Sequence, residues 1–287
     1  MRIGESMKRA LFVHAHPDDE TINNGATMAQ LVEDGVAVTL VTCTRGEEGE
    51  VLVPDLAHLA SHAEDGLGAH REIELTEAMK ALGVKDHRFL AKPGEYRDSG
   101  MIGSPQNDNP NCFWRIDVET GARKLAAIID EIKPQVMVTY DEFGGYGHPD
   151  HIQTHRVAMR AADLAGWKIQ KIYWNIMPKS VVAQGMAAMK EQGSDFFGTD
   201  NIDELPFVKD DSFVTTVIHA PNQVDKKMAA MKAHATQISL DGPFFALSNN
   251  LGVQVFGDEY YTLVRGEKSG PFNNRNLEQD LFAGVTL

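Results

Sequence analysis

The stretch Val13-His14-Ala15-His16-Pro17-Asp18-Asp19-Glu20 decides how this chain folds and where its polar chemistry lies. It follows the apolar run 10–13, whose composition predicts a short strand buried on both faces. Pro17 has no N–H to donate, and so it ends the strand. Two histidines and three carboxylates then stand within seven residues. Open α/β sheets place their ligands at the carboxyl ends of such strands, so the stretch predicts a metal site. The alternative is a polar loop in which Asp18 or Asp19 caps the next helix.

The composition of the 287-residue chain bounds its class. With 43% hydrophobic and 24% charged residues, it can bury a large core. The formal net charge of −14 argues against a nucleic-acid partner, because phosphate binding requires basic patches. No apolar run is long enough to span a membrane, and the charged opening 1–9 leads into too short an apolar stretch for a signal peptide. Cys43 and Cys112 could bridge, but so few cysteines suit free thiols. We therefore expect a soluble cytoplasmic protein, of open oligomeric state.

A βαβ unit is the next feature of the chain. Apolar residues at helical spacing predict a helix over 21–34, ended by Gly35, and a β-branched run predicts a second strand over 36–43. Two strands joined by one helix are expected to be parallel. The first turn lacks a G-x-G-x-x-G sequence, which argues against a nicotinamide cofactor. The acidic loop 44–50 leaves the second strand at the same edge, where one carboxylate has room to reach the pocket.

The remaining patterns complete an α/β chain. They predict helices over 69–82, 118–132, 181–190 and 223–236, and strands over 86–90, 135–140, 168–174, 213–219 and 259–264. The segment 91–115 has no periodicity and is typical of a binding loop. Within it, 96–100 could contact a hydroxyl-rich ligand or carry an internal pair between Arg97 and Asp98. A further loop is expected over 192–206.

No repeat or linker divides the chain. We therefore expect a single domain over 1–287 with a Rossmann-like, mostly parallel sheet flanked by helices. Its core would occupy 1–170, and a smaller C-terminal lobe, 171–287, would pack on that core.

A second polar cluster, Asp141-Glu142-Phe143-Gly144-Gly145-Tyr146-Gly147-His148-Pro149-Asp150-His151, follows the strand predicted over 135–140. It repeats the first arrangement, with histidine and aspartate around a proline at a helix entry. Pro149 suits a first helical turn, where its missing N–H is not needed. His148 and His151 stand three residues apart, so they lie on neighbouring positions of one turn. His155 continues that face and is interpreted as a helix-surface histidine.

The two clusters together hold the parts of an amide hydrolase. They can supply two neutral imidazoles and one carboxylate to a divalent ion, and three protein ligands with an open position are typical of catalytic zinc. Such an ion lowers the pKa of bound water and polarises a carbonyl. A free carboxylate can take the proton of that water, and a histidine can face the oxyanion or protonate the leaving amine. The same ligand types also bind non-haem iron, so they do not fix the metal.

Residues 16–20 and 148–151, taken as a pair, resemble the LmbE-like (PIG-L) family of zinc-dependent N-acetylglucosaminide deacetylases. Four further segments are similar to the branch that removes acetate from N-acetylglucosaminyl-inositol, a pseudodisaccharide: Gly46–Glu50, Tyr96–Met101, Gly144–Gly147 and Phe245–Asn250. The resemblance covers most of the chain and is weakest over 170–205. It implies a small sugar substrate and one Zn²⁺ per subunit, with Fe²⁺ as an alternative.

The resemblance also implies the metal ligands and the base. His16, Asp19 and His151 would bind the zinc ion. Asp18 would act as general base on the metal-bound water. The family pattern leaves His14 out of the ligand set, and we expect it to have a structural role.

The remaining roles follow from the same resemblance. His148, oriented by Asp150, would stabilise the oxyanion or assist departure of the amine. Tyr146, in a loop hinged by glycines, would close over the acetyl carbonyl. Arg71 and Asp98 match positions that hold the sugar and inositol hydroxyls.

Two other functions stay open. A sister branch, the mycothiol S-conjugate amidases, is similar in the same motifs but releases a large cysteinyl acyl group; it tends to carry proline where this chain has Gly147. A non-catalytic sugar-binding module is the alternative from a different class. Such a module should still bind after chelation of the metal, whereas the hydrolase should lose its activity.

Overall fold

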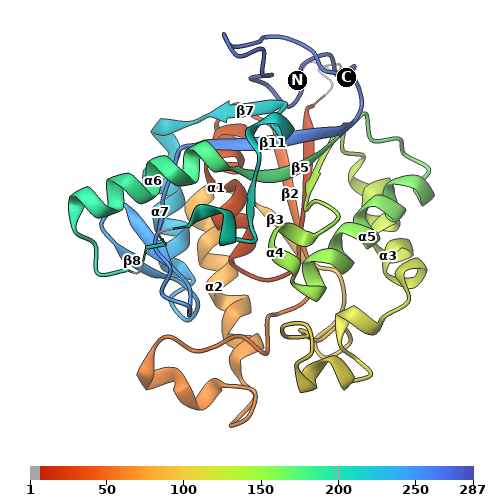
Figure 1. Cartoon of the computed structure of the whole chain (residues 1–287). Helices are drawn as coiled ribbons and strands as arrows, with labels where there is room; N and C mark the ends of the chain where they lie inside the picture. The colour runs from red at the N-terminus through yellow and green to blue at the C-terminus, as the bar shows by residue number, and fades with distance from the viewer. Residues whose placement is uncertain (1–6, 197, 200) are drawn as a thin grey trace.

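A twisted sheet runs through the middle of the molecule (Figure 1). The computed structural model describes residues 7–196, 198–199 and 201–287, so most of the opening segment 1–9 lies outside the described residues. The strands of the sheet are β1 (Arg9–His14), β2 (Ala37–Thr42), β3 (Asp86–Phe89), β4 (Val136–Thr139), β5 (Lys171–Pro178), β6 (Val208–Lys209), β7 (Thr216–His219) and β11 (Asp258–Arg265). Their order is β3-β2-β1-β4-β5-β11-β7, and β6 pairs with β5 beside this path.

The sheet is mostly parallel, as the sequence predicted. The pairs from β3 to β5 are parallel, and β6 is parallel to β5. Only β11 runs antiparallel to its neighbours β5 and β7. Strands from both sides of residue 170 pair with one another in this single sheet. The division of the chain at that residue stays a prediction.

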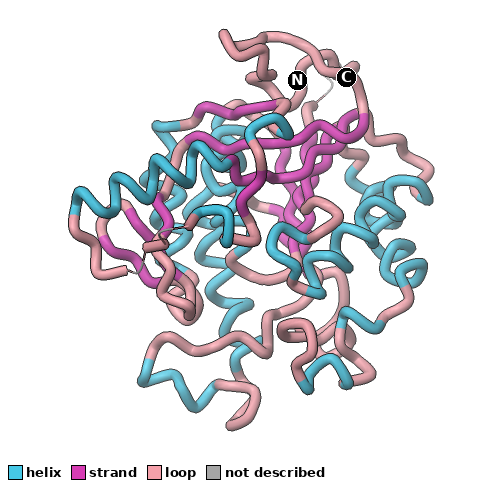
Figure 2. The backbone as a smooth tube through the Cα atoms, viewed as in Figure 1, coloured by secondary structure: helices cyan, strands magenta, loops and turns pink. Residues whose placement is uncertain are grey.

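Helices cover both faces of the sheet, as Figure 2 also shows. They are α1 (Asp19–Glu33), α2 (Leu67–Leu82), α3 (Val118–Ile132), α4 (Gly144–Gly147), α5 (Pro149–Leu164), α6 (Lys179–Gln192) and α7 (Val224–Ala233). Helices α3 and α5 pack on one face, while α1, α2 and α7 pack on the other (Figure 1). Among the described residues, each helix is too short or too polar to cross a lipid bilayer.

Strand β1 shows why the sheet forms the core. Ala10 and Phe12 belong to the cluster beneath α1 and α2, whereas Leu11 and Val13 belong to the cluster beneath α3 and α5. All four side chains have no solvent exposure. A strand that is covered on both faces needs apolar residues at every position, and this explains the unbroken apolar run in the sequence.

Some elements differ from those expected. Strand β5 begins three residues later than predicted and runs on to Pro178, and a small antiparallel sheet, β8 (Ser239–Asp241), β9 (Phe244–Ala246) and β10 (Val253–Gln254), was not predicted. Strands of two or three residues are too short to show a period of two. The segment 91–115 contains short 3₁₀ turns at Pro105–Asp108 and Phe113–Arg115. Cys43 and Cys112 are free and buried.

Candidate active site

The two polar clusters meet because β1 and β4 are neighbours in the sheet and run in the same direction. Their carboxyl ends therefore bring His16, Asp19 and His151 together. His16 Nδ1 lies 3.4 Å from Asp19 Oδ2, His151 Nε2 lies 3.4 Å from the same oxygen, and the two nitrogens are 3.3 Å apart. A tetrahedral ion with bonds of about 2.0–2.1 Å requires its ligand atoms to be about 3.3–3.4 Å apart. These three atoms, the donor triangle, fit such an ion.

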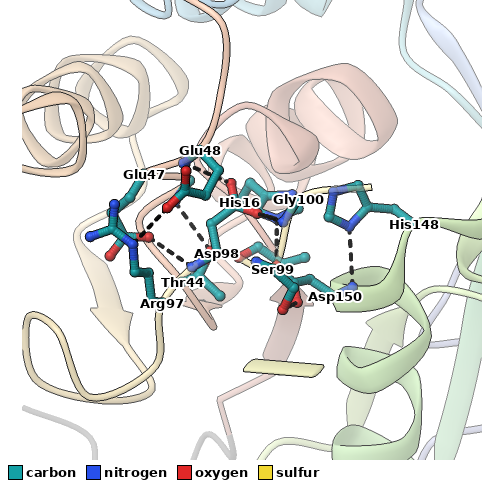
Figure 3. A network of polar contacts seen from close by, with 12 residues as sticks. His16, Thr44, Glu47, Glu48, Arg97, Asp98, Ser99, Gly100, His148 and Asp150 are labelled. Atoms are coloured by element: carbon teal, nitrogen blue, oxygen red, sulfur yellow. Dashed lines mark hydrogen bonds and ion pairs between the residues drawn. The ribbon is translucent and has the colours of Figure 1, made fainter. Parts of the chain in front are cut away.

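The far nitrogen of each imidazole is held by an acceptor. His16 Nε2 donates to Asp150 Oδ2 at 3.2 Å, and His151 Nδ1 donates to the Gly144 carbonyl at 3.1 Å. In its neutral form, each ring would carry its proton on the outer nitrogen and present a lone pair to the triangle, the arrangement that supports metal-bound histidines. Ser99 holds Asp150 in turn, through its N–H at 2.9 Å and through its hydroxyl (Figure 3).

Asp150 therefore differs from its expected role. Its carboxylate orients His16, not His148 (Figure 3). His148 is held instead by the peptide N–H of Asp150, which donates to His148 Nδ1 at 3.1 Å. Proline at position 149 starts helix α5 directly after His148, so the histidine occupies the helix N-cap and its ring accepts this N–H.

Wider groupings of donors surround the triangle. His16, His148 and His151 have nitrogens within 4.8 Å of one another, and His16, Asp98 and Asp150 form a second such group. The two carboxylates, however, face the Nε2 side of His16, at 3.7 and 3.2 Å, away from the triangle. The tighter spacing favours Asp19 as the third ligand.

Asp18 is the free carboxylate beside the triangle. It stands at the N-cap of α1, but its side chain makes no capping bond, so the capping alternative is not realised. Its φ of 129° is strained for a residue with a Cβ, and Glu20 stabilises this turn by accepting the Asp18 N–H at 3.0 Å. Burial raises the pKa of Asp18 to about 6 against the opposing effect of Arg71. A shift toward neutral pH suits a general base.

Arg71 holds the Asp18 carboxylate. Its Nη2 donates to Asp18 Oδ2 at 3.0 Å and to the Pro17 carbonyl, and its Nη1 donates to the Gly46 carbonyl at 2.8 Å. The side chain lines the same cavity, but only its buried Nε lacks a partner among the described residues. Arg71 therefore positions Asp18 in this structure, which the sequence did not predict.

Asp98 also lines the cavity and is largely engaged. It accepts the Gly100 N–H at 2.8 Å and lies 3.7 Å from His16 Nε2. Burial alone would raise the pKa of Asp98, but His16 outweighs burial and lowers it well below its usual range. Arg97 pairs with Glu48 at 2.7 Å (Figure 3). It also pairs with Asp65, so the internal pair with Asp98 was a wrong alternative.

Tyr146 and His148 complete the polar side of the cavity. The ring of Tyr146 stands edge-on to His151 at 4.9 Å and to His148 at 6.0 Å between centroids. Burial raises the pKa of Tyr146, so its hydroxyl keeps its proton and can donate. Burial, together with the neighbouring His16, lowers the pKa of His148 to about 2. A neutral His148 whose Nδ1 accepts an N–H must carry its proton on Nε2.

The cavity has a volume of about 600 Å³ and two unlike sides. The polar side carries the residues above, together with Glu48 and Glu50 of the acidic loop, from which one carboxylate was expected. The other side comes mostly from the C-terminal part of the chain and is largely apolar: Ile176, Met177, Leu205, Pro206, Phe207, Phe245, Leu247, Leu251 and Val253. This apolar wall was not predicted, because its residues are scattered over loops and over the strands β5, β9 and β10.

Two other histidines have structural partners. His14 is buried between Asn24, at 2.8 Å, and the Tyr140 hydroxyl, at 3.2 Å, in keeping with a structural role. His155 is half-buried and bonds to the Tyr140 carbonyl at 3.0 Å. The sequence analysis did not identify Tyr140 as a residue of the site. Its ring stacks on His151 at 4.3 Å between centroids. Its position at the end of a predicted strand, directly before the second polar cluster, was the available signal.

The fold and the site together define a class of protein. A donor triangle with an open side, a free carboxylate beside it and proton donors across a deep cavity are the parts of a metal-dependent hydrolase. The chain belongs to the PIG-L family, described as GlcNAc-PI de-N-acetylase, whose model matches residues 11–162.

Known proteins resemble the chain over nearly its full length. A protein of Geodermatophilus obscurus named 1D-myo-inositol 2-acetamido-2-deoxy-alpha-D-glucopyranoside deacetylase is 54% identical, covering 97% of this chain and 98% of its own. The N,N'-diacetylchitobiose deacetylase of Pyrococcus horikoshii shares the fold, with a TM-score of 0.54 at 20% identity over 90% of this chain and 84% of its own. The 4-carboxy-2-hydroxymuconate hydratase of Pseudomonas putida also shares it, with a TM-score of 0.58 at 19% identity over 93% of this chain and all of its own. The fold by itself therefore does not determine the chemistry.

Proposed function

We propose that the protein hydrolyses the acetamide of N-acetylglucosaminyl-inositol, giving glucosaminyl-inositol and acetate, as a step of mycothiol biosynthesis. The observation that carries the proposal is the donor triangle of His16, Asp19 and His151 with Asp18 free beside it. The name of the 54% identical relative supports the substrate. We place the protein in the cytoplasm, since its buried free cysteines suit a reducing compartment.

We propose His16, Asp19 and His151 as the ligands of one Zn²⁺, with Fe²⁺ as the alternative. Bound there, the ion would lower the pKa of a water molecule and polarise the amide carbonyl. Asp18, held by Arg71, takes the proton of the attacking water and delivers it to the amine nitrogen as the C–N bond breaks. Because its Nδ1 is occupied, His148 can donate only from Nε2, and we propose that it donates to the oxygen of the amide as charge develops there. Tyr146 adds a second donor from its turn.

Two side chains of the polar side are available for contacts with the substrate. Asp98 and Arg71 both line the cavity, and we propose that they face the sugar and inositol hydroxyls. Their existing bonds mean that they arrive pre-oriented, with side chains that lose little freedom on binding.

The S-conjugate amidase is the second candidate, and the apolar wall of the cavity favours it. One observation stands against it. Gly147 has φ of 91°, and the Phe143 ring lies 3.0 Å from where a Cβ on Gly147 would be. Proline is locked near φ of about −65° and could not adopt this turn. Since the amidase branch tends to carry proline there, the turn favours the deacetylase.

The experiment compares two substrates with the purified protein. We expect acetate release from N-acetylglucosaminyl-inositol to exceed, in kcat/KM, amine release from a bulky mycothiol S-conjugate. Chelation should abolish both reactions and added Zn²⁺ should restore them. Turnover that survives complete chelation would refute the metal mechanism, and a preference for the bulky conjugate would favour the amidase. Sugar binding without any turnover would favour the binding module.

A further inference from the structure

Lys209 connects the C-terminal part of the chain to the turn that carries Tyr146. It lies on β6, where it pairs with Pro178 of β5, so its backbone is fixed to the main sheet. Its Nζ lies 3.2 Å from Asp141 Oδ2, and the ammonium also stands over the Phe143 ring, 5.0 Å from the centroid. Lys209 and Asp141 both line the active-site cavity.

Asp141 divides its carboxylate between two partners. While Oδ2 faces Lys209, Oδ1 accepts the N–H of Gly145 at 2.8 Å. Gly145 has φ of 75° and ψ of −67°, a conformation that a residue with a Cβ rarely adopts. The peptide carbonyl of Asp141 also accepts the Gly144 N–H at 2.9 Å. The 141–147 turn therefore depends on one carboxylate, and Lys209 fixes the orientation of that carboxylate.

Phe143 gives Lys209 a second contact with the same turn. The Phe143 ring packs against Gly147, and the backbone carbonyl of Phe143 accepts the Gly147 N–H at 3.1 Å. The ring is 46% exposed, so little else in the described protein holds it in place. An ammonium over an aromatic face attracts the ring and restrains it.

The 141–147 turn holds two groups of the site. Tyr146 points its ring at His151, and the Gly144 carbonyl accepts His151 Nδ1–H at 3.1 Å. A turn that moves would shift a proton donor and loosen a metal ligand together. Positions of reacting groups must be kept within about 1 Å for full rates.

We propose that Lys209 is a positioning residue for the reaction: through Asp141 and Phe143 it holds the 141–147 turn in the conformation that presents Tyr146 to the substrate. The inference rests on the proposed function for the role of Tyr146. The contact itself is independent of that function.

The test uses Lys209→Met, which keeps the stem and removes the charge, and Lys209→Arg, which keeps the charge. Lys179→Met is the matched control, because it removes an ion pair with Asp203 in which no residue of the 141–147 turn takes part. All variants are studied as zinc-loaded protein. Amide hydrogen exchange is measured over 141–148, and kcat and KM are measured for N-acetylglucosaminyl-inositol.

For Lys209→Met we expect exchange over 141–148 to accelerate about tenfold, as a local opening becomes easier. We expect kcat to fall about tenfold with KM within about twofold, because the turn acts on the transition state. Lys209→Arg should keep the exchange rate over 141–148 and kcat near those of the parent protein. Lys179→Met should leave both quantities unchanged. Asp141→Asn should change exchange and kcat as Lys209→Met does. The double variant should change them little further than either single variant.

Unchanged exchange over 141–148 in Lys209→Met would overturn the proposal, whatever happens to the rate. Faster exchange with an unchanged kcat would also overturn it, since the turn would then move without consequence for the reaction. If the parent protein released no acetate, the proposed function would fail. The exchange measurement would still decide whether Lys209 holds the turn.

Discussion

His16-Pro17-Asp18-Asp19 and His148-Pro149-Asp150-His151 follow neighbouring parallel strands with nearly the same pattern, yet their side chains have different roles. In the first motif, His16 belongs to the donor triangle, and Asp18, the aspartate after proline, lies outside it. In the second, the histidine stands outside the triangle and the aspartate after proline supports another ligand. The fourth residue, Asp19 in the first motif and His151 in the second, contributes an atom to the donor triangle in both.

The backbone at the helix entry produces this difference. His148 has extended backbone, so its ring turns back to cap α5 and accepts the Asp150 N–H. Asp18 stands at the cap of α1 with φ of 129°, so its carboxylate leaves the helix end and meets Arg71. Similar sequences therefore give the proposed base in one motif and a supporting carboxylate in the other.

The largest expected effect comes from Asp18. Asp18→Asn should lower kcat by about 10²–10⁴-fold while the protein keeps its metal, because it removes the proposed general base and none of the proposed ligands. Steady-state rates alongside metal analysis check this. Full activity in the variant would assign the proton transfer elsewhere.

His148 should come next. His148→Ala removes a donor to the oxyanion, and we expect kcat to fall by about 10²–10³-fold with metal retained. Steady-state rates and metal analysis check this prediction as well. Loss of the metal would show that His148 is a ligand, as the His16–His148–His151 grouping allows.

Asp150 should act on the metal more than on the rate. Asp150→Asn weakens the acceptor that orients His16, and we expect zinc affinity to fall by about 10–100-fold. At saturating zinc most of the activity should return. A competition titration with a chromophoric chelator measures the affinity. An unchanged zinc affinity would contradict the supporting role assigned to Asp150 in the second motif.

The smallest effect is a dependence on pH. Burial alone would lower the pKa of His16, but Asp98 and Asp150 outweigh burial and raise it well above its usual range. Metal-free His16 is therefore protonated at neutral pH, and zinc must displace that proton. Zinc affinity should fall about tenfold for each unit by which the pH decreases below this pKa. Calorimetry in two buffers of different ionisation enthalpy should detect about one released proton; none would contradict the shift.

The sequence predicted the sheet and the meeting of the two clusters because both depend on regular patterns. The apolar run 10–13 and the β-branched run 36–43 fix parallel strands, and parallel strands bring their carboxyl ends to one edge. The supporting role of Asp150 was not predictable in this way, because it depends on how the ring of His148 turns. Lys209 was missed because it lies 68 positions beyond Asp141 and shows no motif.

Adjacent aspartates allow the most direct test of the donor triangle. Zinc content is measured after exhaustive dialysis of Asp18→Asn and Asp19→Asn, two isosteric changes one residue apart. The account predicts one zinc ion per chain in Asp18→Asn and little zinc in Asp19→Asn, because only Asp19 Oδ2 completes the triangle with His16 and His151. Zinc retained by Asp19→Asn and lost from Asp18→Asn would contradict it.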